Sequence, residues 1–375
     1  MRPQPPSAAE RRDRLRLART DKVGPVAFRE LMSRYREAAR VLEALPTLAR
    51  RGGGAPLRIP TPAEAEDEIA RGEALGARLL SLGDPDFPPQ LAALDPPPPL
   101  IWARGGLELL KRPAVAIVGA RVASAAGQRF ARELAAEIGQ AGLVVVSGLA
   151  RGVDGAAHAG SIDTGTVAVL AGGVDDVYPP EHLDLYRAIA EAGCLVSESA
   201  VGRAARAQDF PRRNRIIAGL SLGVVVVEAE LRSGSLITAR LAAEQGREVF
   251  AVPGSPLDPR ARGTNDRIRQ GATLCEGAED VLRVIQSLGA MREAGDPFEP
   301  PPADQDAIDL AADFLRAKVE ALLSPTPTPR DEIVRALGAP APGIYAALVE
   351  LSLAGRAELL PGGLVASGDA GRDAV

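Results

Sequence analysis

Side chains that bind metals or form disulfides are scarce in this sequence of 375 residues. Only two cysteines, Cys194 and Cys275, and two histidines occur. A disulfide framework needs paired cysteines and a zinc site needs clustered thiol or imidazole ligands, so neither is expected. We predict no bound metal and no cofactor, and two unpaired thiols fit the reducing cytoplasm.

Aromatic residues and long apolar runs are scarce as well. Aromatics make up 3% of the chain and apolar residues 46%, so the core must consist of Val, Leu, Ile and Ala, as in parallel α/β sheets. No stretch approaches the roughly 18 consecutive apolar residues of a membrane span, and no signal-peptide pattern opens the sequence. We expect a soluble protein without membrane insertion.

The chain as a whole has no excess of positive charge, since its formal net charge is −5. The basic residues are nevertheless clustered. Residues 1–51 contain thirteen Arg or Lys against six Asp or Glu, and residues 203–215 contain five Arg against one Asp. These two segments are the places where contact with an anionic partner is expected.

Composition divides the chain into five segments. We predict a small helical domain, a linker with an extended segment, a Rossmann-like domain, an acidic Pro-rich linker and a winged helix, at residues 1–50, 51–110, 111–288, 289–306 and 307–370 respectively. The N-terminal helices allow two interpretations. They form either a plain packing domain or a module similar to SAM and helix-hairpin-helix domains, which present backbone amides to phosphates.

The central segment repeats an apolar run, a Gly-rich turn and an amphipathic helix. The runs expected to be buried strands are residues 114–119, 143–148, 166–173, 194–198, 223–229 and 248–254. This alternation predicts a doubly wound parallel sheet with helices on both faces. Ligands of such sheets bind outside the carboxyl ends of the strands.

The turn after the first of these strands, "VAIVGARVASAAG", resembles a dinucleotide fingerprint with one decisive difference. Arg121 stands where a glycine must let the pyrophosphate approach, which argues against NAD. Gly119, Arg121 and Ser124 could instead bind a phosphate at the start of a helix. The sequence also has no P-loop, so an ATP-driven motor is not expected.

Similar small-residue turns follow other strands. "SGLARGVDGAAH" contributes Ser147, Gly148 and Arg151, and "LRSGSLITARLA" contributes Ser233, Gly234 and Ser235. Asp154 and His158 could form a catalytic pair on one helix face, although without a nucleophile Asp154 better suits orienting Arg151 or capping the turn. Turns of this kind on one edge predict a long anion-binding groove.

The stretch "DFPRRNRIIAGLS" belongs to the same edge. Arg212, Arg213 and Arg215 could contact phosphates, Asn214 could contact a base or the backbone, and Phe210 could stack on a base. Together these residues predict binding of single-stranded nucleic acid without sequence preference. The alternative is an exposed helix start with Phe210 in the core.

These motifs, with "TVAVLAGGVDDVYPPEH" and "GTNDRIRQGA", resemble the bacterial DNA-processing protein A family (DprA/Smf) over residues 111–275. The resemblance implies a cytoplasmic homodimer without enzymatic activity. Such a protein binds incoming single-stranded DNA in natural transformation, recruits RecA and loads it onto DNA held by single-strand-binding protein. The DNA-contacting positions that it implies are Arg121, Ser147, Gly148, Phe210, Arg213 and Asn214. The family often has a lysine where this chain has Ala207, with Arg206 beside it.

Two alternative functions require features that the sequence lacks. A phosphoribohydrolase on a related sheet would need a P-G-G-x-G-T-x-x-E stretch, but Gly172-Gly173 is followed by "VDDVYP". A winged helix that reads DNA would need cations on its recognition helix, and "PGIYAALVELSLA" has none. That helix is therefore expected to pack against protein.

Overall fold

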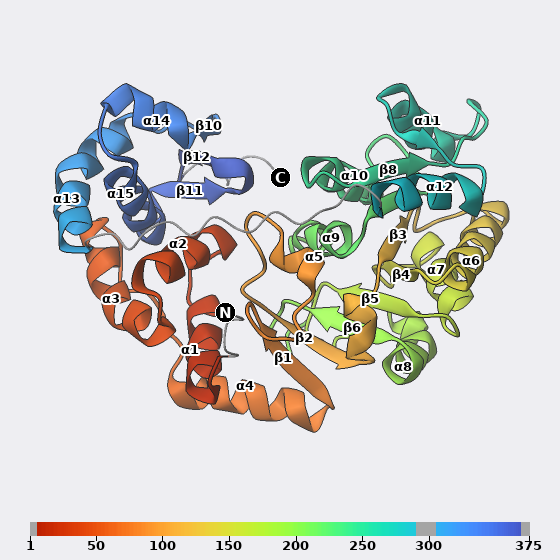
Figure 1. Cartoon of the computed structure of the whole chain (residues 1–375), viewed down its shortest axis with the longest axis horizontal. Coiled ribbons are helices and arrows are strands. Elements are labelled where there is room, and N and C mark those ends of the chain that lie inside the picture. The colour runs from red at the N-terminus through yellow and green to blue at the C-terminus, as the bar shows by residue number, and fades with distance from the viewer. Residues whose placement is uncertain (1–5, 290–304, 369–375) are drawn as a thin grey trace. The chain divides into compact units, whose positions relative to one another are not determined.

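The computed structural model describes residues 6–289 and 305–368, and these form two compact units (Figure 1). The sheet unit comprises Glu68–Leu94 and Ile101–Ala294, and the terminal unit comprises Met1–Asp67, Asp95–Leu100 and Gly295–Val375. Each is treated separately below. Within the described ranges, every helix is too short or too polar to cross a membrane. The predicted acidic linker at 289–306 lies almost wholly outside these ranges.

The described part of the sheet unit contains a nine-stranded sheet in the order β1-β2-β6-β5-β4-β3-β7-β8-β9. Strand β2 runs antiparallel to β6, and the strands from β6 to β9 are parallel. The strands are β1 (Ala77–Ser81), β2 (Leu100–Gly105), β3 (Ala114–Val118), β4 (Val144–Ser147), β5 (Thr166–Leu170), β6 (Cys194–Ser197), β7 (Gly223–Val226), β8 (Glu248–Ala251) and β9 (Thr273–Leu274). The predicted doubly wound parallel sheet is confirmed.

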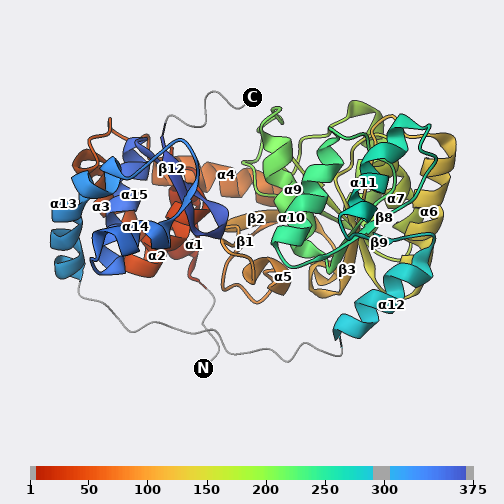
Figure 2. The ribbon, with the colours of Figure 1, turned by 90° about the horizontal axis from the view of Figure 1, so that it is seen from above.

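Helices cover both faces of this sheet, as Figure 2 shows for α9 and α10 on one side and α6 and α7 on the other. The helices of the unit are α4 (Pro62–Ala74, which begins in the terminal unit), α5 (Pro89–Ala92), α6 (Ala125–Gln140), α7 (Val153–Ser161), α8 (Leu183–Ala192), α9 (Asp209–Leu220), α10 (Gly234–Glu244), α11 (Arg262–Arg269) and α12 (Ala278–Gly289). Alternate residues of β3 point to opposite faces of the sheet. Ala116 packs in the core beneath α9 and α10, whereas Ile117 packs in the core beneath α6.

Residues 51–110 differ from the predicted linker and extended segment, because they contain α4, β1, α5 and β2. Trp102 of β2 is fully buried, and its indole nitrogen donates a 3.0 Å hydrogen bond to Oε1 of Glu68. Gly72 of α4 lies so close that an added Cβ would overlap the indole ring. Two strands thus extend the sheet where a linker was expected, with β2 antiparallel to β6 and β1 at the edge.

The terminal unit joins the N-terminal helices to the winged helix. Its elements are α1 (Ala8–Ala18), α2 (Pro25–Tyr35), α3 (Ala38–Arg51), α13 (Gln305–Ala321), α14 (Arg330–Leu337), α15 (Ala341–Ala354), and the strands β10 (Thr328–Pro329), β11 (Ala357–Leu360) and β12 (Leu364–Ser367). Val349 and Leu353 of α15 share an apolar core with Leu45 and Leu48 of α3. The recognition helix therefore packs against protein, as its lack of cations predicts.

A charged side chain is also buried in this unit, where α15 packs against α13. Glu350 of α15 is fully buried and accepts a 2.8 Å hydrogen bond from Nε of Arg316 on α13. Burial raises the pKa of this carboxyl, although hydrogen bonds from Arg316 oppose the shift. Gly52, which follows α3, lies against the backbone carbonyl of Glu350, so the Gly-rich turn after α3 packs against α15.

Candidate nucleic-acid interface

The loops that follow β3, β4, β5 and β7 meet the start of α9 at the carboxyl edge of the sheet. Three contacts show this convergence. Arg213 of α9 reaches the carbonyl of Gly148 after β4, Asn214 reaches Gly234 after β7, and Phe210 contacts Tyr178 after β5. The sequence-predicted turns are thus brought together, although not all of their side chains reach the surface.

The loop after β4 has a strained backbone conformation, which buried side chains of α7 stabilise. Leu149 is fully buried with φ of 56°, a left-handed conformation that costs a residue with a Cβ about 1–2 kcal/mol. Oδ2 of Asp154 accepts hydrogen bonds from the amides of Gly148 (3.1 Å) and Ala150 (3.4 Å). Asp154 therefore acts as a cap for this loop, which is one of the two structural roles predicted for it.

His158 supports the same loop from the core. Its Nε2 accepts from the amide of Leu149 at 3.3 Å, and its Nδ1 lies 2.7 Å from the hydroxyl of Thr166. Because that hydroxyl donates to the carbonyl of Val145, we assign the ring proton to Nδ1. Burial lowers the pKa of His158 to about 3, so the ring is neutral. A fully buried, fully bonded imidazole has no access to a substrate, which argues against the catalytic pair.

Arg213, predicted to contact DNA, lies inside this framework. Its Nη1 donates 2.6 Å hydrogen bonds to the carbonyls of Gly148 and Val169, and only 8% of the residue is exposed. Burial lowers the pKa of the guanidinium to about 10, partly offset by nearby Asp154, so it is charged at neutral pH. An added Cβ on Gly148 would overlap this group. Arg213 therefore joins the ends of β4 and β5.

Other predicted contacts are also bound within the protein. Ser147 is fully buried and donates to the carbonyl of Ile117 at 2.6 Å. Asn214, 8% exposed, donates to the carbonyl of Gly234 at 3.3 Å, and Arg215 forms an ion pair with Glu198. We correct the interpretation of these three side chains. A helix has one face against its sheet, and the sequence alone does not tell which arginine of a cluster lies there.

The hydrogen-bond donors of Ser124 both bind a carboxylate. Its amide and hydroxyl donate to Glu228 at 2.9 and 2.6 Å, and its hydroxyl accepts from the amide of Gly127. The Ser124 hydroxyl, which was predicted to bind a phosphate, therefore donates to a carboxylate instead, and this negative charge would repel a phosphate. Gly119 likewise serves packing, because a Cβ there would lie 2.6 Å from Val153.

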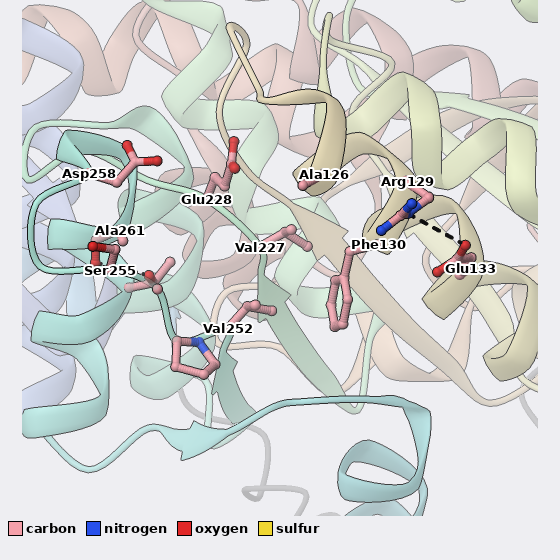
Figure 3. Close-up of a pocket in the computed structure, with 14 residues that line it drawn as sticks. Ala126, Arg129, Phe130, Glu133, Val227, Glu228, Val252, Ser255, Asp258 and Ala261 are labelled. Carbon is pink, nitrogen blue, oxygen red and sulfur yellow. Dashed lines mark hydrogen bonds and ion pairs between the residues drawn. The ribbon is translucent and has the colours of Figure 1, made fainter.

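Beyond Glu228 lies a hollow of about 300 Å³, shown in Figure 3. Phe130, Val227 and Val252 form apolar walls, and the carboxylates of Glu228 and Asp258 lie on its polar side. Hydrogen bonds from the side chain and amide of Arg260 lower the pKa of Asp258, so this carboxyl stays ionised. An acidic hollow is a poor place for phosphates and bounds the candidate interface on this side.

Phe210 lies at the start of α9 beneath cations. The Cζ atoms of Arg121 and Arg213 lie over its ring, 5.0 and 5.9 Å from the centroid. Tyr178 meets it in a T-shaped arrangement, with ring centroids 5.4 Å apart and an interplanar angle of 61°. Phe210 is thus half-buried in a cluster of two guanidiniums and a second aromatic ring.

The surface of the interface carries arginines that are free to bind an anion. Arg121, Arg206 and Arg212 are exposed, and neither a hydrogen bond nor an ion pair joins their side chains to another described residue. Arg151 is exposed with only a long contact of 3.9 Å to Glu181. These four predicted residues remain available, and Arg206 occupies the exposed position next to Ala207.

The turn after β7 caps α10. Oγ of Ser233 accepts from the amide of Ser235 at 3.4 Å and lies 2.8 Å from the hydroxyl of that residue, which is buried. Gly234 is exposed, and its carbonyl accepts a hydrogen bond from Asn214 of α9. The hydroxyls are thus committed to the cap, and Gly234 presents backbone only.

Tyr178 is the residue at this edge that sequence reasoning did not single out. It lies in "VDDVYPPEH", where its only signal was an aromatic residue in a turn outside any strand or helix pattern. In a chain with 3% aromatics that position was informative. Its contact with Phe210, 32 residues later in the sequence, could not be read from spacing.

Comparison with known proteins agrees with this geometry. Residues 78–286 match the family described as DNA recombination-mediator protein A, residues 8–70 match the DprA-like N-terminal HHH domain, and residues 299–363 match the DprA winged helix domain. The chain is 40% identical to protein Smf of Escherichia coli over 284 residues, covering 74% of each chain. It is 44% identical to DNA processing protein DprA of Bacillus subtilis over 213 residues, covering 56% of this chain and 72% of that one.

Two solved structures are similar as well. DNA processing protein A from Streptococcus pneumoniae has a TM-score of 0.56 and 38% identity, covering 60% of this chain and 78% of that one. The protein from Helicobacter pylori, whose structure describes a single-stranded DNA binding mode, has a TM-score of 0.52 and 28% identity, covering 58% and 97%. On its matched domains and its sheet, the chain belongs to the DNA recombination-mediator protein A family.

Proposed function

We propose that this protein binds single-stranded DNA at the carboxyl edge of its sheet and acts as a recombination mediator. The observation that carries the proposal is the set of exposed, unpaired guanidiniums of Arg121, Arg206 and Arg212, with Arg121 lying over the ring of Phe210 in an aromatic pair with Tyr178. Guanidiniums bind phosphates with charge-assisted hydrogen bonds, and aromatic rings stack on unpaired bases. A strand with splayed bases satisfies both, whereas a duplex hides its ring faces.

The arrangement favours binding without sequence preference. Side chains that could read base edges are used inside the protein, since the amide of Asn214 bonds to Gly234 and Ser124 bonds to Glu228. What remains at the surface is charge and ring faces, which every nucleotide can use. The single-stranded DNA binding described for the Helicobacter pylori relative supports the same ligand.

The specific cellular role that we propose is the one that the family resemblance implies. As a homodimer in the cytoplasm, the protein would receive incoming single strands in natural transformation, recruit RecA and load it onto DNA held by single-strand-binding protein. Relatives named as DNA processing proteins support a role in handling DNA. In this role the protein holds the strand and performs no covalent chemistry on it.

The test is the salt dependence of binding to labelled oligo-dT. For single strands the logarithm of the affinity falls with that of the salt concentration with a slope of about −0.7 per phosphate contact. We expect Arg121→Ala combined with Arg212→Ala to weaken binding and to make the slope less steep by about 1.4 if each residue contacts one phosphate. Arg187→Ala, at a 64% exposed position on α8, is the matched control.

Unchanged affinity and slope in the double variant would place the DNA elsewhere. The mediator role has its own measurement, the rate at which RecA assembles on DNA coated with single-strand-binding protein. Wild-type protein should accelerate assembly and the double variant should not. Acceleration by the double variant at wild-type strength would separate RecA loading from this edge of the sheet.

A further inference from the structure

We infer that the hollow beside Glu228 is a docking site for a partner protein, which inserts an arginine side chain into it. The inference goes beyond the proposed function, because the occupant is a protein and the hollow disfavours phosphates. The segments that follow β3, β7 and β8 line the hollow (Figure 3). Since β3 lies between β4 and β7, this is the point where the strand order switches direction, and open α/β sheets bind ligands at such points.

The first step concerns the charges at the hollow. Asp258 pairs with Arg260 at 3.0 Å, and Glu133 lies 3.9 Å from Arg129. In the parts of the chain that the structure describes, Glu228 forms no ion pair, and Arg260 acts on it only at longer range. Three carboxylates thus face two guanidiniums, so the hollow has one negative charge in excess. A single further cation complements it.

The second step concerns how Glu228 is held. The amide of Ser124 donates to Oε2 of Glu228 at 2.9 Å, and the hydroxyl of Ser124 donates to Oε1 at 2.6 Å. Each carboxylate oxygen can accept a second hydrogen bond, so both oxygens keep a free acceptor site. A guanidinium presents two parallel N–H donors that match a carboxylate. Ser124 thus fixes the orientation of a half-buried carboxylate that can bind arginine through both oxygens.

The third step concerns the apolar walls. Figure 3 shows the ring of Phe130 beside Val227 and Val252, and all three residues pack against the core beneath α6. The methylene stem of arginine is apolar, and its planar guanidinium stacks on aromatic rings, which the ammonium of lysine cannot do. The volume of about 300 Å³ is at the lower end of ligand pockets, which span about 300–1,000 Å³. The hollow therefore accommodates one side chain rather than a polymer.

The fourth step identifies a protein as the source of the arginine. Leu257, between two residues that line the hollow, is 88% exposed, and Val122, in the turn that leads to Ser124, is 85% exposed. These apolar side chains can contact the residues that flank an arginine in a protein segment, whereas a free guanidinium compound leaves them in water. Two hydrogen bonds, of 3.2 and 2.8 Å, join the side chain of Asn265 to the backbone of Gly254, so the loop after β8 is already ordered for docking.

The experiment titrates the peptide acetyl-Leu-Arg-Leu-amide into protein with ¹³C-labelled valine methyl groups. The NMR signals of Val227 and Val252 should shift and saturate. A peptide with citrulline, the neutral analogue of arginine, should bind about 10- to 150-fold more weakly, the range expected for loss of a hydrogen bond to a charged group. Excess oligo-dT should not displace the arginine peptide, because the two sites are separate.

Variants of the hollow test the two contacts separately. Glu228→Gln retains an acceptor for the amide of Ser124 and should weaken peptide binding by the same 10- to 150-fold, about the value of the lost charge, without changing oligo-dT affinity. Asp184→Asn removes the same charge at a 97% exposed position on α8 and is the matched control. Phe130→Leu keeps an apolar wall and should weaken binding about 2- to 30-fold and abolish any preference for arginine over lysine.

Four results would overturn the inference. They are absence of saturable shifts at Val227 and Val252, equal binding of the arginine and citrulline peptides, equal peptide binding by wild type and Glu228→Gln, and displacement of the peptide by oligo-dT. Agmatine, a free guanidinium compound, should bind at least about tenfold more weakly than the peptide, and equal affinity would make the hollow a small-molecule site instead. The salt slope of oligo-dT binding is measured independently, so the proposed function stands or falls separately.

Discussion

Nη1 of Arg213 donates a 2.6 Å hydrogen bond to the carbonyl oxygen of Gly148, and the same nitrogen donates to Val169. A single buried cation thereby connects α9 to the carboxyl ends of β4 and β5. Its charge also lies near the buried carboxyl of Asp154, which holds the amides of the same loop. The shape of the proposed DNA-binding surface thus depends on a group that the surface does not expose.

We predict that Arg213→Ala destabilises the sheet unit by about 3 kcal/mol or more. Two buried carbonyls lose their donor, and the buried carboxyl of Asp154 loses the favourable charge that lies near it. Trp102, the only tryptophan in the chain, is fully buried in this unit, so its fluorescence in urea reports the unit's unfolding. Oligo-dT binding should weaken through distortion of the loop.

The neighbouring exposed residue is the matched control for that variant. Arg212→Ala should leave the Trp102 transition within about 0.5 kcal/mol of wild type, as is usual for surface substitutions. It should nevertheless reduce the salt slope of oligo-dT binding by about 0.7. If the two variants behaved alike in both measurements, the division between a structural and a DNA-binding arginine would be wrong.

Two glycines of the interface should respond differently to alanine. A Cβ on Gly148 would overlap the Arg213 guanidinium, so Gly148→Ala should cost about 1–3 kcal/mol, as overpacking in a core does. A Cβ on Gly234 meets no atom within 4 Å, and the residue opens α10, where alanine is the better helix former. Gly234→Ala should therefore keep or raise stability. Urea unfolding followed at Trp102 measures both, and equal destabilisation would contradict the placement of Arg213.

The strands and helices of the sheet that sequence reasoning identified share one property. Parallel strands buried on both faces appear as unbroken apolar runs, so β3 to β8 could be located. Strand β2 was missed because four prolines precede it, and β9 because it is two residues long. Helix α9 begins at Asp209 and contains Pro211, because a proline is tolerated in the first turn of a helix.

The site was harder to predict than the fold for a geometric reason. Sequence reasoning placed the right loops at one edge, because the carboxyl ends of parallel strands meet there. Adjacent helical residues point about 100° apart, so one of two neighbouring arginines can lie inside the protein and the other in solvent. The sequence alone could not tell that Arg213 is the buried one and Arg212 the exposed one. Nor could it pair Tyr178 with Phe210, since that contact depends on how the loop after β5 folds.

His158 should make the sheet unit less stable in mild acid. Its pKa is about 3 in the folded protein against an ordinary value of 6.5, so below pH 6.5 the unfolded chain binds a proton that the folded chain does not. Stability supplied by the neutral ring is therefore complete above pH 6.5 and is lost as the pH falls toward 3. From pH 7 to pH 5 this loss amounts to about 2 kcal/mol.

The variant His158→Gln isolates that contribution. Glutamine does not titrate, so its stability should fall about 2 kcal/mol less than that of wild type between pH 7 and pH 5. Asp154 contributes in the opposite direction, because burial raises its pKa, but it is present in both proteins, as are the nearby His182 and Arg213. Parallel pH profiles for the two proteins, followed at Trp102, would show that His158 is protonated in the folded state.

The terminal unit offers a test of whether the winged helix reads DNA. Leu353 of α15 is fully buried in the core shared with α3, so Leu353→Ala should destabilise this unit by about 2–5 kcal/mol. Because α15 has no basic residue and packs on other helices, we expect oligo-dT affinity to stay within about twofold of wild type, well under the tenfold that 1.4 kcal/mol represents. Leu310→Ala, at a 60% exposed position of the same unit, is the control for loss of leucine volume. The unit's own transition is followed by circular dichroism, while Trp102 fluorescence verifies that the sheet unit is intact. A tenfold loss of affinity in Leu353→Ala with an unchanged Trp102 transition would make the terminal unit part of the DNA-binding surface.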